Sequence, residues 1–264
     1  MLELRNVSKT FNAGTVNEKL ALDHIDLTLN DGDFVTVIGG NGAGKSTMLN
    51  AIAGVWKPDT GSIVIDGVDV TNMPEYKRAA FLGRVFQDPM LGTAGDMEIG
   101  ENLALAARRG RKRTLHWNHS QAEYDVYREQ LADLGLGLED RMSSKVGLLS
   151  GGQRQAVTLL MATLRHPQLL LLDEHTAALD PATAEKVMNL TDSIVTGTHL
   201  TALMVTHNMQ NAITYGNRLI MMSAGKIILD IAGEEKKKLT IEDLLRKFRE
   251  LGGAQMPTDR MILG

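Results

Sequence analysis

The sequence contains no cysteine among its 264 residues. Without cysteine, the chain can form no disulfide, thiolate zinc site or cysteine nucleophile. It also has no excess of basic residues, since 28 lysines and arginines stand against 32 aspartates and glutamates and give a formal net charge of −4. Because nucleic-acid-binding proteins favour a basic surface, we expect no nucleic acid among the partners.

Long apolar runs are also missing. A transmembrane helix needs about 20 apolar residues in a row, and no run approaches that length. The first residues show no basic region followed by an apolar segment, so we expect no secretory signal. The hydrophobic content of 43% and the charged content of 23% are ordinary for a soluble globular protein. We therefore expect a cytoplasmic chain that meets a membrane only as a peripheral partner.

The order of the expected elements predicts an α/β fold. Strands are expected at 24–29, 33–40 and 61–67, and a helix at 45–54. From residue 168 onward, short apolar strands alternate with helices, which indicates a mostly parallel sheet with crossover helices. The predicted fold combines this sheet with an antiparallel N-terminal β part and an inserted α-helical subdomain.

The middle of the chain differs from both ends. Residues 98–107 and 120–134 have helical patterns, with no convincing strand between them. We predict a single domain over 1–264, in which residues 89–165 form the inserted helical subdomain and residues 234–264 form a C-terminal helical tail.

Two charged runs have plain interpretations. Residues 234–238 are expected to form a solvated linker before an amphipathic helix at 240–250. The run RRGRKR at 108–113 is expected to be a solvated surface loop. The alternative for this run is attraction to an anionic membrane surface, worth about 1 kcal/mol per basic residue.

A phosphate-binding motif follows the strand expected at 33–40. The stretch GGNGAGKST fits the pattern G-x-x-x-x-G-K-[ST] between a strand and a helix. Its glycines let backbone N–H groups face one point, and the following helix directs its positive end there. Lys45 is expected to reach the β- and γ-phosphates, and Ser46 to offer its hydroxyl to Mg²⁺. The predicted nucleotide-binding residues, called the phosphate loop below, are Gly39, Gly40, Asn41, Gly42, Ala43, Gly44, Lys45, Ser46 and Thr47.

Two acidic residues follow a run of four leucines in LLLLDEH. The leucines predict a central strand buried on both faces, whose carboxyl end lies at the edge where ligands bind in open α/β sheets. Two acids in this place would by themselves indicate a strand end and a helix cap. Together with the phosphate loop, they predict that Asp173 holds Mg²⁺ and that Glu174 faces the water that attacks the γ-phosphate. A divalent cation also offsets the charge of Asp173 at the end of a buried strand.

A further motif separates this chain from other phosphate-loop proteins. With LSGGQRQ at 149–155, the sequence resembles the ATP-binding cassette (ABC) ATPases over nearly its whole length. Six motifs occur in the family's order. They are GGNGAGKST, the glutamine of VFQDP (Gln87), LSGGQ, LLLLDE, AALD at 177–180 and VTHN at 205–208. The resemblance implies a P-loop NTPase core that binds and hydrolyses ATP with Mg²⁺.

The LSGGQ motif predicts a second anion-binding site. Ser150, Gly151 and Gly152 precede a helix that we expect to begin near Gln153. Because the phosphate loop already holds one nucleotide, these four residues are expected to bind the nucleotide of a second copy of the chain. The resemblance implies this arrangement, a two-fold dimer that buries two ATP molecules.

The resemblance also assigns the remaining site residues. Gln87 resembles the glutamine whose oxygen reaches Mg²⁺ and the attacking water, and His207 resembles the switch histidine at the γ-phosphate. Asp180 resembles the residue that communicates between the two sites. Phe11 stands where the family often has tyrosine and resembles the aromatic that stacks on adenine; an ordinary core aromatic is the alternative. The predicted catalytic residues are Glu174, His207, Gln87 and Lys45, and the predicted metal ligands are Ser46, Gln87 and Asp173.

The leading functional hypothesis is the ATP-hydrolysing subunit of a membrane transporter at the cytoplasmic face of the cell membrane. Residues 87–106 resemble those of bacterial import-type cassettes, some linked to amino acids, which favours an importer of a small solute. The resemblance implies separate membrane permease subunits as partners, with an extracytoplasmic solute-binding protein as a further one. The helical subdomain and the Gln87 loop are the expected contact surface.

Two alternatives remain beside this hypothesis. One is a soluble ABC-type ATPase without a permease, similar to that of iron–sulfur cluster assembly. The other is a non-enzymatic, nucleotide-gated scaffold, against which the intact Glu174 and His207 argue. One departure from the family pattern is His175, which stands where proline is usual and adds a titratable side chain beside Glu174.

Overall fold

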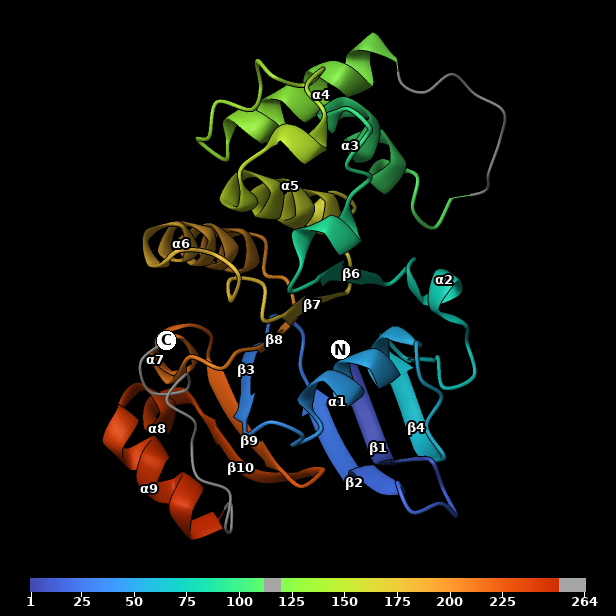
Figure 1. Cartoon of the computed structure of the whole chain (residues 1–264), viewed down its shortest axis with the longest axis vertical. Helices are drawn as coiled ribbons and strands as arrows, with labels where there is room; N and C mark the ends of the chain where they lie inside the picture. Colours follow the sequence, from blue (N-terminus) through green and yellow to red (C-terminus); the bar gives the residue numbers. More distant parts are fainter. Residues whose placement is uncertain (112–119, 252–264) are drawn as a thin grey trace.

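The computed structural model describes residues 1–111 and 120–251, whose strands form two sheets (Figure 1). The first sheet is antiparallel and has the order β2-β1-β4-β5. Its strands are β1 (Leu2–Phe11), β2 (Lys19–Leu29), β4 (Thr60–Ile65) and β5 (Val68–Asp69). This sheet is the antiparallel N-terminal part that the sequence predicted.

The second sheet has the order β10-β9-β3-β8-β7-β6. All its neighbouring strands are parallel except β10, which runs antiparallel to β9. Its strands are β3 (Phe34–Gly39), β6 (Leu82–Val85), β7 (Leu169–Asp173), β8 (Ala202–Val205), β9 (Arg218–Ser223) and β10 (Lys226–Ala232). This mostly parallel sheet confirms the predicted α/β fold class.

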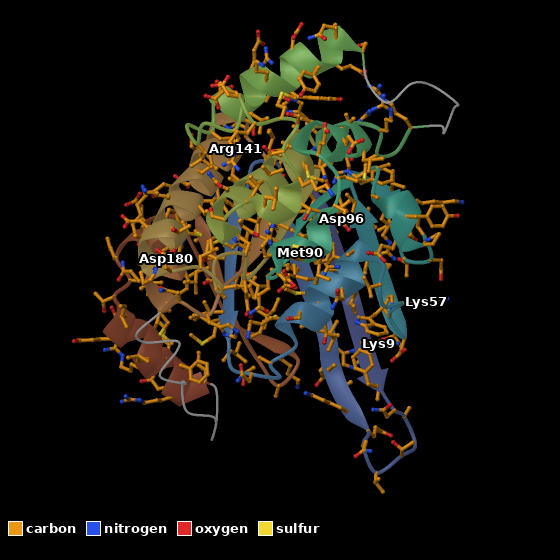
Figure 2. The ribbon with its side chains drawn as sticks, turned by 45° about the horizontal axis from the view of Figure 1, so that its top comes forward. Lys9, Lys57, Met90, Asp96, Arg141 and Asp180 are labelled. Carbon is orange, nitrogen blue, oxygen red and sulfur yellow. The ribbon has the colours of Figure 1, made fainter. Side chains whose placement is uncertain are left out.

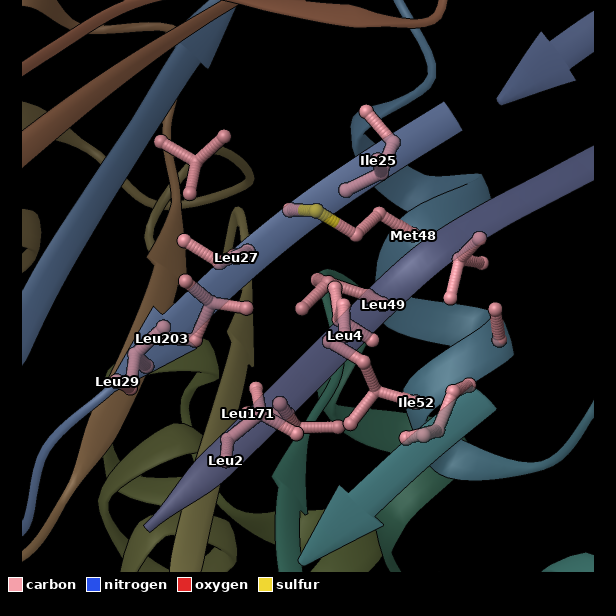
Figure 3. Packing of buried hydrophobic residues seen from close by; sticks show 14 of the residues in the cluster. Leu2, Leu4, Ile25, Leu27, Leu29, Met48, Leu49, Ile52, Leu171 and Leu203 are labelled. Carbon is pink, nitrogen blue, oxygen red and sulfur yellow. The ribbon is translucent and has the colours of Figure 1, made fainter. Parts of the chain in front are cut away.

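Helix α1 (Lys45–Ala53) is anchored in a hydrophobic cluster to which both sheets contribute. Figure 3 shows its Met48, Leu49 and Ile52 packed among leucines of β1, β2, β7 and β8. Burying one such side chain stabilises the fold by about 1.5–3 kcal/mol relative to leaving it exposed. This packing fixes the helix whose first residue is the lysine of the phosphate loop.

The helices of the middle region lie in the upper part of Figure 1. Leu103, Leu131 and Val157, one from each of three helices, belong to a hydrophobic cluster separate from that of α1. The boundaries of a helical subdomain at 89–165 stay a prediction. The elements of this region are η1 (Pro89–Gly92), α3 (Ile99–Ala107), α4 (Gln121–Ala132), η2 (Val146–Leu148) and α5 (Gly151–Thr163). The short helix α2 (Glu75–Arg78) precedes β6 and lies outside this region.

Strand β7 is buried on both faces, as its four leucines predict. Leu169 and Leu171 belong to the cluster around α1, whereas Leu170 and Leu172 belong to a cluster covered by α5 and α6 (Pro181–Gly197). The strand that ends in the two acidic residues is therefore a rigid support for them.

The C-terminal part corrects one expectation. Residues 234–238, expected as a solvated linker, belong mostly to helix α8, and Lys236 is only 2% exposed. Its Nζ donates hydrogen bonds to the carbonyl oxygens of Tyr215 and Gly216, and burial lowers its pKa to about 8. The charge run gave no sign of this contact because the two carbonyls come from a distant turn. The helices here are α7 (Met209–Thr214), α8 (Gly233–Lys237) and α9 (Ile241–Leu251).

Helix α9 closes the C-terminal side of the parallel sheet. Its Leu244 and Phe248 are fully buried in a cluster with residues of α7 and β9, as the amphipathic pattern at 240–250 predicts. Within the described residues, no helix combines the length and the apolar content that crossing a membrane requires.

Candidate ATP-binding and hydrolysis site

The phosphate loop joins β3 to α1. At two of its positions, Gly39 and Gly44, the backbone path leaves room only for glycine. A Cβ atom on Gly39 would lie 2.3 Å from the carbonyl oxygen of Met222, and one on Gly44 would lie 2.5 Å from that of Ala21. Gly44 also has a φ of 102°, in the left-handed region that other residues rarely adopt. The two glycines therefore fix the tight curl that directs backbone N–H groups inward.

Lys45 lies across its own loop. Its side chain is 5% exposed, and its Nζ donates hydrogen bonds to the carbonyl oxygens of Gly39 at 2.8 Å and Gly40 at 3.1 Å. Burial lowers the pKa of Lys45, and the nearby charges of Glu174 and Asp173 oppose that shift. The amine predicted to bind phosphates is thus held inside the loop and within the field of the acid pair.

A pocket of about 290 Å³ opens over the phosphate loop. Phe11, Lys19 and Ala21 line it together with Gly42 to Thr47, so the predicted aromatic does lie beside the loop. The Phe11 ring packs edge-on against Trp56, with 5.3 Å between the ring centroids. Sequence reasoning missed Lys19, which lines the pocket, and Trp56, which packs against Phe11, because neither belongs to a motif.

The strand register brings the acid pair and the histidine to the same sheet edge. Asp173 and Val37 both pair with Val205 of β8, so β7 and β8 end level with each other and β3 continues two residues further into the phosphate loop. His207 follows two residues later, and its Nε2 lies 2.5 Å from Oε1 of Glu174. The structure therefore joins the predicted base and the predicted switch histidine directly.

Glu174 has an unusual backbone. Its φ of 49° lies in the left-handed region, and its backbone N–H donates to the carbonyl oxygen of Val205 at 3.0 Å. A non-glycine residue in this region is uncommon, and such conformations concentrate at functional sites. The two neighbouring acidic side chains contact different partners, Arg84 for Asp173 and His207 for Glu174.

Asp173 has a cationic neighbour that the sequence did not reveal. Its side chain is 17% exposed, and its Oδ2 lies 3.7 Å from Nη2 of Arg84 on β6. Burial raises the pKa of Asp173, although the positive charges of Arg84 and Lys45 oppose the shift. No motif marks Arg84, because the pair forms only through the pairing of β6 with β7.

His175, the departure from the family pattern, is buried and neutral. Its ring is 2% exposed, and its Nε2 lies 3.0 Å from Oγ1 of Thr191 on α6. Because that hydroxyl donates to the carbonyl oxygen of Val187, Nε2 carries the hydrogen and donates to Thr191. Burial lowers the pKa of His175 to about 4. His175 thereby ties the residue after Glu174 to α6.

Gln87 and Asp180 lie outside the pocket over the phosphate loop. Gln87 is exposed in the bend after β6. Asp180 is the exposed N-cap of α6, labelled in Figure 2, and accepts a hydrogen bond from the backbone N–H of Thr183 at 3.1 Å. Hydrogen bonds to Thr183 lower the pKa of Asp180. The structure of one chain thus leaves the predicted roles of both residues as predictions.

The LSGGQ turn differs in detail from the expectation. Helix α5 begins at Gly151 rather than near Gln153, because Ser150 is the N-cap. The Ser150 hydroxyl accepts from the Gln153 N–H at 3.3 Å, and the Gln153 side chain accepts from the Ser150 N–H at 3.2 Å. A Cβ on Gly152 would lie 2.2 Å from Cγ2 of Thr183, so this glycine is needed for packing against α6.

The predicted metal donors suit magnesium. The hydroxyl of Ser46, the side-chain oxygen of Gln87 and the carboxylate of Asp173 are all oxygen ligands, which Mg²⁺ prefers. In the part of the chain that the structure describes, no cluster of three or more His, Cys, Asp or Glu residues could hold a metal.

Comparison with known proteins gives the site its family. A family model described as ABC transporter matches residues 22–177. The chain belongs to the ABC transporter family. It is an ATP-binding ATPase subunit of that family, as the six motifs predict.

Individual relatives agree with this membership. The chain is 44% identical over 252 residues to the tyrosine transport ATP-binding protein of Clostridioides difficile, covering 94% of this chain and 98% of that protein. It is 36% identical over 230 residues to a spermidine/putrescine import ATP-binding protein of Haemophilus ducreyi, covering 87% of this chain and 57% of that protein. Among solved structures, it is similar to a dimeric ATP-binding cassette in a post-hydrolysis state bound to ADP and Pi. The TM-score is 0.73 at 29% identity, covering 88% of this chain and 98% of that chain.

Proposed function

We propose that this ABC ATPase energises a membrane importer of a small solute, with amino acids as the substrate class. The observation that carries the catalytic part is the 2.5 Å contact between Glu174 and His207 at the sheet edge beside the phosphate loop. It joins a carboxylate that can accept a proton to a group that can orient it.

In the proposed reaction, Glu174 accepts the proton of the water that attacks the γ-phosphate, and His207 holds the carboxylate in line. Lys45 leaves the carbonyl oxygens of its own loop to bind the β- and γ-phosphates. Ser46, Asp173 and Gln87 hold Mg²⁺, which when bound neutralises phosphate charge. Positioning and electrostatic stabilisation supply most of the catalysis in phosphoryl transfer.

A second copy of the chain completes each site in this proposal. The Ser150–Gln153 turn does not contribute to the pocket over the phosphate loop of its own chain, among the residues described. The N-terminus of α5 presents backbone N–H groups that suit an anion. Two chains related by a two-fold axis would each offer this turn to the partner's nucleotide. The similar cassette bound to ADP and Pi is a dimer, which supports such a pairing.

A groove that is lined in part by β6 suits the membrane permease. It has a volume of about 1660 Å³ and is lined by residues of α2, β6, η1, α3 and α5. Leu91 and Leu105 in its wall are 70% and 53% exposed, and exposed apolar side chains in a concave surface mark protein interaction sites. Phe86, the residue before Gln87, also lines the groove, so a permease segment held there could act on that loop.

Part of the basic run at 108–113 also lines this groove. Arg108 donates to the carbonyl oxygen of Ala104, and Arg109 donates to that of Ala162, both at 2.8 Å. These two arginines therefore bind helix ends instead of forming a fully solvated loop. Lys112 and Arg113 lie outside the described residues.

The substrate class rests on relatives rather than on the site. The ATPase does not touch the solute, and the relative that covers nearly the whole chain is named for tyrosine transport. Uptake of radiolabelled amino acids, with tyrosine first, should fall in cells that lack this chain and return with the wild type but not with Glu174→Gln. An extracytoplasmic solute-binding protein would be a further partner, and the cytoplasmic face of the membrane would be the place of work.

A soluble ATPase without a permease is the alternative function. Purification of the tagged chain from detergent-solubilised membranes distinguishes the two functions. The proposal predicts an integral membrane protein at a fixed ratio to the chain. Recovery of the whole chain from the soluble fraction, free of any membrane protein, would contradict it.

A further inference from the structure

Arg84 is held on three sides where the parallel sheet meets the phosphate-loop helix. Its Nη2 lies 3.7 Å from Oδ2 of Asp173 and donates to Oδ1 of Asn50 on α1 at 2.7 Å. Its guanidinium carbon lies 4.5 Å from the ring centroid of Phe86. The side chain is 14% exposed, so one partly dehydrated cation links the strand of the acid pair to α1.

The position of Arg84 is not explained by stability alone. Its Nε is buried without a hydrogen-bond partner among the residues described. Leaving a buried donor unpaired is unfavourable, and such groups in native structures call for an explanation. The explanation that the geometry offers is the neighbouring carboxylate, which ends a strand buried on both faces.

Asp173 needs a counter-charge in this environment. Glu174 follows it directly, and like charges close together destabilise each other. Lys45 donates its hydrogens to the carbonyl oxygens of the phosphate loop. Over the described ranges, Arg84 is the cation that forms an ion pair with Asp173.

We propose that Arg84 is the positioning residue of the magnesium carboxylate: it holds Asp173 and offsets its charge between catalytic cycles, and it competes with Mg²⁺ for that charge. The inference rests on the proposed Mg²⁺-dependent hydrolysis of ATP. It adds a cation, outside the family's motifs, that sets how much Mg²⁺ the site requires.

The first test measures the Mg²⁺ requirement of nucleotide binding. A fluorescent ATP analogue is titrated against the protein at increasing Mg²⁺. Arg84→Met removes the charge while keeping length and contact with the aromatic ring, and the Mg²⁺ concentration at half-maximal binding should fall at least threefold. Arg84→Lys keeps the charge and should stay within twofold of the wild type. An unchanged or increased requirement in Arg84→Met would overturn the competition.

The second test measures thermal unfolding in EDTA without nucleotide, so it does not depend on ATP hydrolysis. Arg84→Met should lower the midpoint temperature in the wild type, because Asp173 loses its counter-charge. In an Asp173→Asn background the same change should lower it by less than half as much, because no charge remains to be offset. Equal losses in both backgrounds would show that Arg84 acts only through Asn50 and Phe86, and would refute the inference.

Arg128→Met provides the matched control. Arg128 on α4 lies over the ring of Tyr124, with 6.0 Å from the guanidinium carbon to the ring centroid. Its replacement also removes the charge of an arginine that lies over an aromatic ring, but it leaves Asp173 untouched. We expect Arg128→Met to lower the midpoint temperature by the same amount in the wild type and in the Asp173→Asn background. If the thermal cycle succeeds while the wild type does not hydrolyse ATP, the proposed function fails and the pairing stands.

Discussion

Glu174 combines a left-handed backbone with a direct contact to His207, and both features concern the proposed proton acceptor. Glu174→Gln keeps the size of the side chain and its ability to contact the histidine but cannot accept a proton. We expect turnover to fall about 10²–10⁴-fold, the usual contribution of general acid–base catalysis, while ATP still binds. Phosphate release and binding of a fluorescent ATP analogue measure the two effects. Unchanged phosphate release would remove Glu174 from its role.

His175 should make stability depend on pH in the acid range. Its pKa is lowered from 6.5 to about 4 in the folded chain, so between these values the unfolded chain binds more protons than the folded one. The stability from this residue is therefore complete above pH 6.5 and is lost as the pH falls towards 4.

Chemical denaturation of the wild type and of His175→Gln checks this dependence. Gln cannot titrate but can still donate to Thr191. We expect the free energy of unfolding of the wild type, relative to the variant, to fall by about 2–3 kcal/mol between pH 7 and pH 4. A constant difference over this range would show that His175 does not remain neutral in the folded chain.

Sequence patterns reveal site residues that belong to a motif and miss those that reach the site from elsewhere. The phosphate loop, Glu174 and His207 are recognisable because their chemistry needs fixed residue types at fixed spacing. Arg84 and Lys19 have no such spacing, since strand pairing alone brings the first to Asp173 and hairpin folding alone brings the second to the pocket.

At the scale of elements, the contact between α5 and α6 depends on Gly152. A Cβ at this position would lie 2.2 Å from Cγ2 of Thr183, a β-branched side chain with little freedom to move. Overpacking of this kind costs about 1–3 kcal/mol, so Gly152→Ala should lower the free energy of unfolding by about that amount.

Gly151→Ala is the matched control for that prediction. Its Cβ would lie 3.1 Å from Cδ2 of Leu179, the end of a flexible side chain that can shift. We expect a smaller loss of stability in urea denaturation than for Gly152→Ala. Equal stability of the two variants would contradict the assignment of Gly152 to helix packing.

Element types follow from sequence more reliably than their ends and contacts. The helices expected at 45–54 and 98–107 occur at 45–53 and 99–107, because apolar periodicity marks both and a glycine ends the first. The start of α5 was placed too late, since Ser150 caps the helix while both glycines take part in it. Sequence reasoning missed helix α8. The burial of its Lys236 depends on hydrogen bonds to the carbonyl oxygens of Tyr215 and Gly216, which lie about twenty residues away in the sequence.

At the scale of the whole molecule, the groove beside β6 is assembled from elements far apart in the sequence. No local sequence pattern predicts this groove, although the helical subdomain and the Gln87 loop are the expected contact surface for a permease. The prediction of a dimer likewise rests on the family resemblance and on the N-terminus of α5, which needs an anion supplied by a second chain. Both surfaces remain proposals, and the dimer is the one on which the account of hydrolysis depends.

Light scattering of Glu174→Gln with and without Mg·ATP tests the central claim most directly. We expect the variant to be a monomer without nucleotide and to reach twice the monomer mass with Mg·ATP, because the Ser150 turn of each chain then binds the nucleotide of its partner. Ser150→Arg in the same variant should prevent the change, since a large side chain would occupy the partner's nucleotide site. A variant that stays monomeric with saturating Mg·ATP, both alone and with its co-purified permease, would contradict the account.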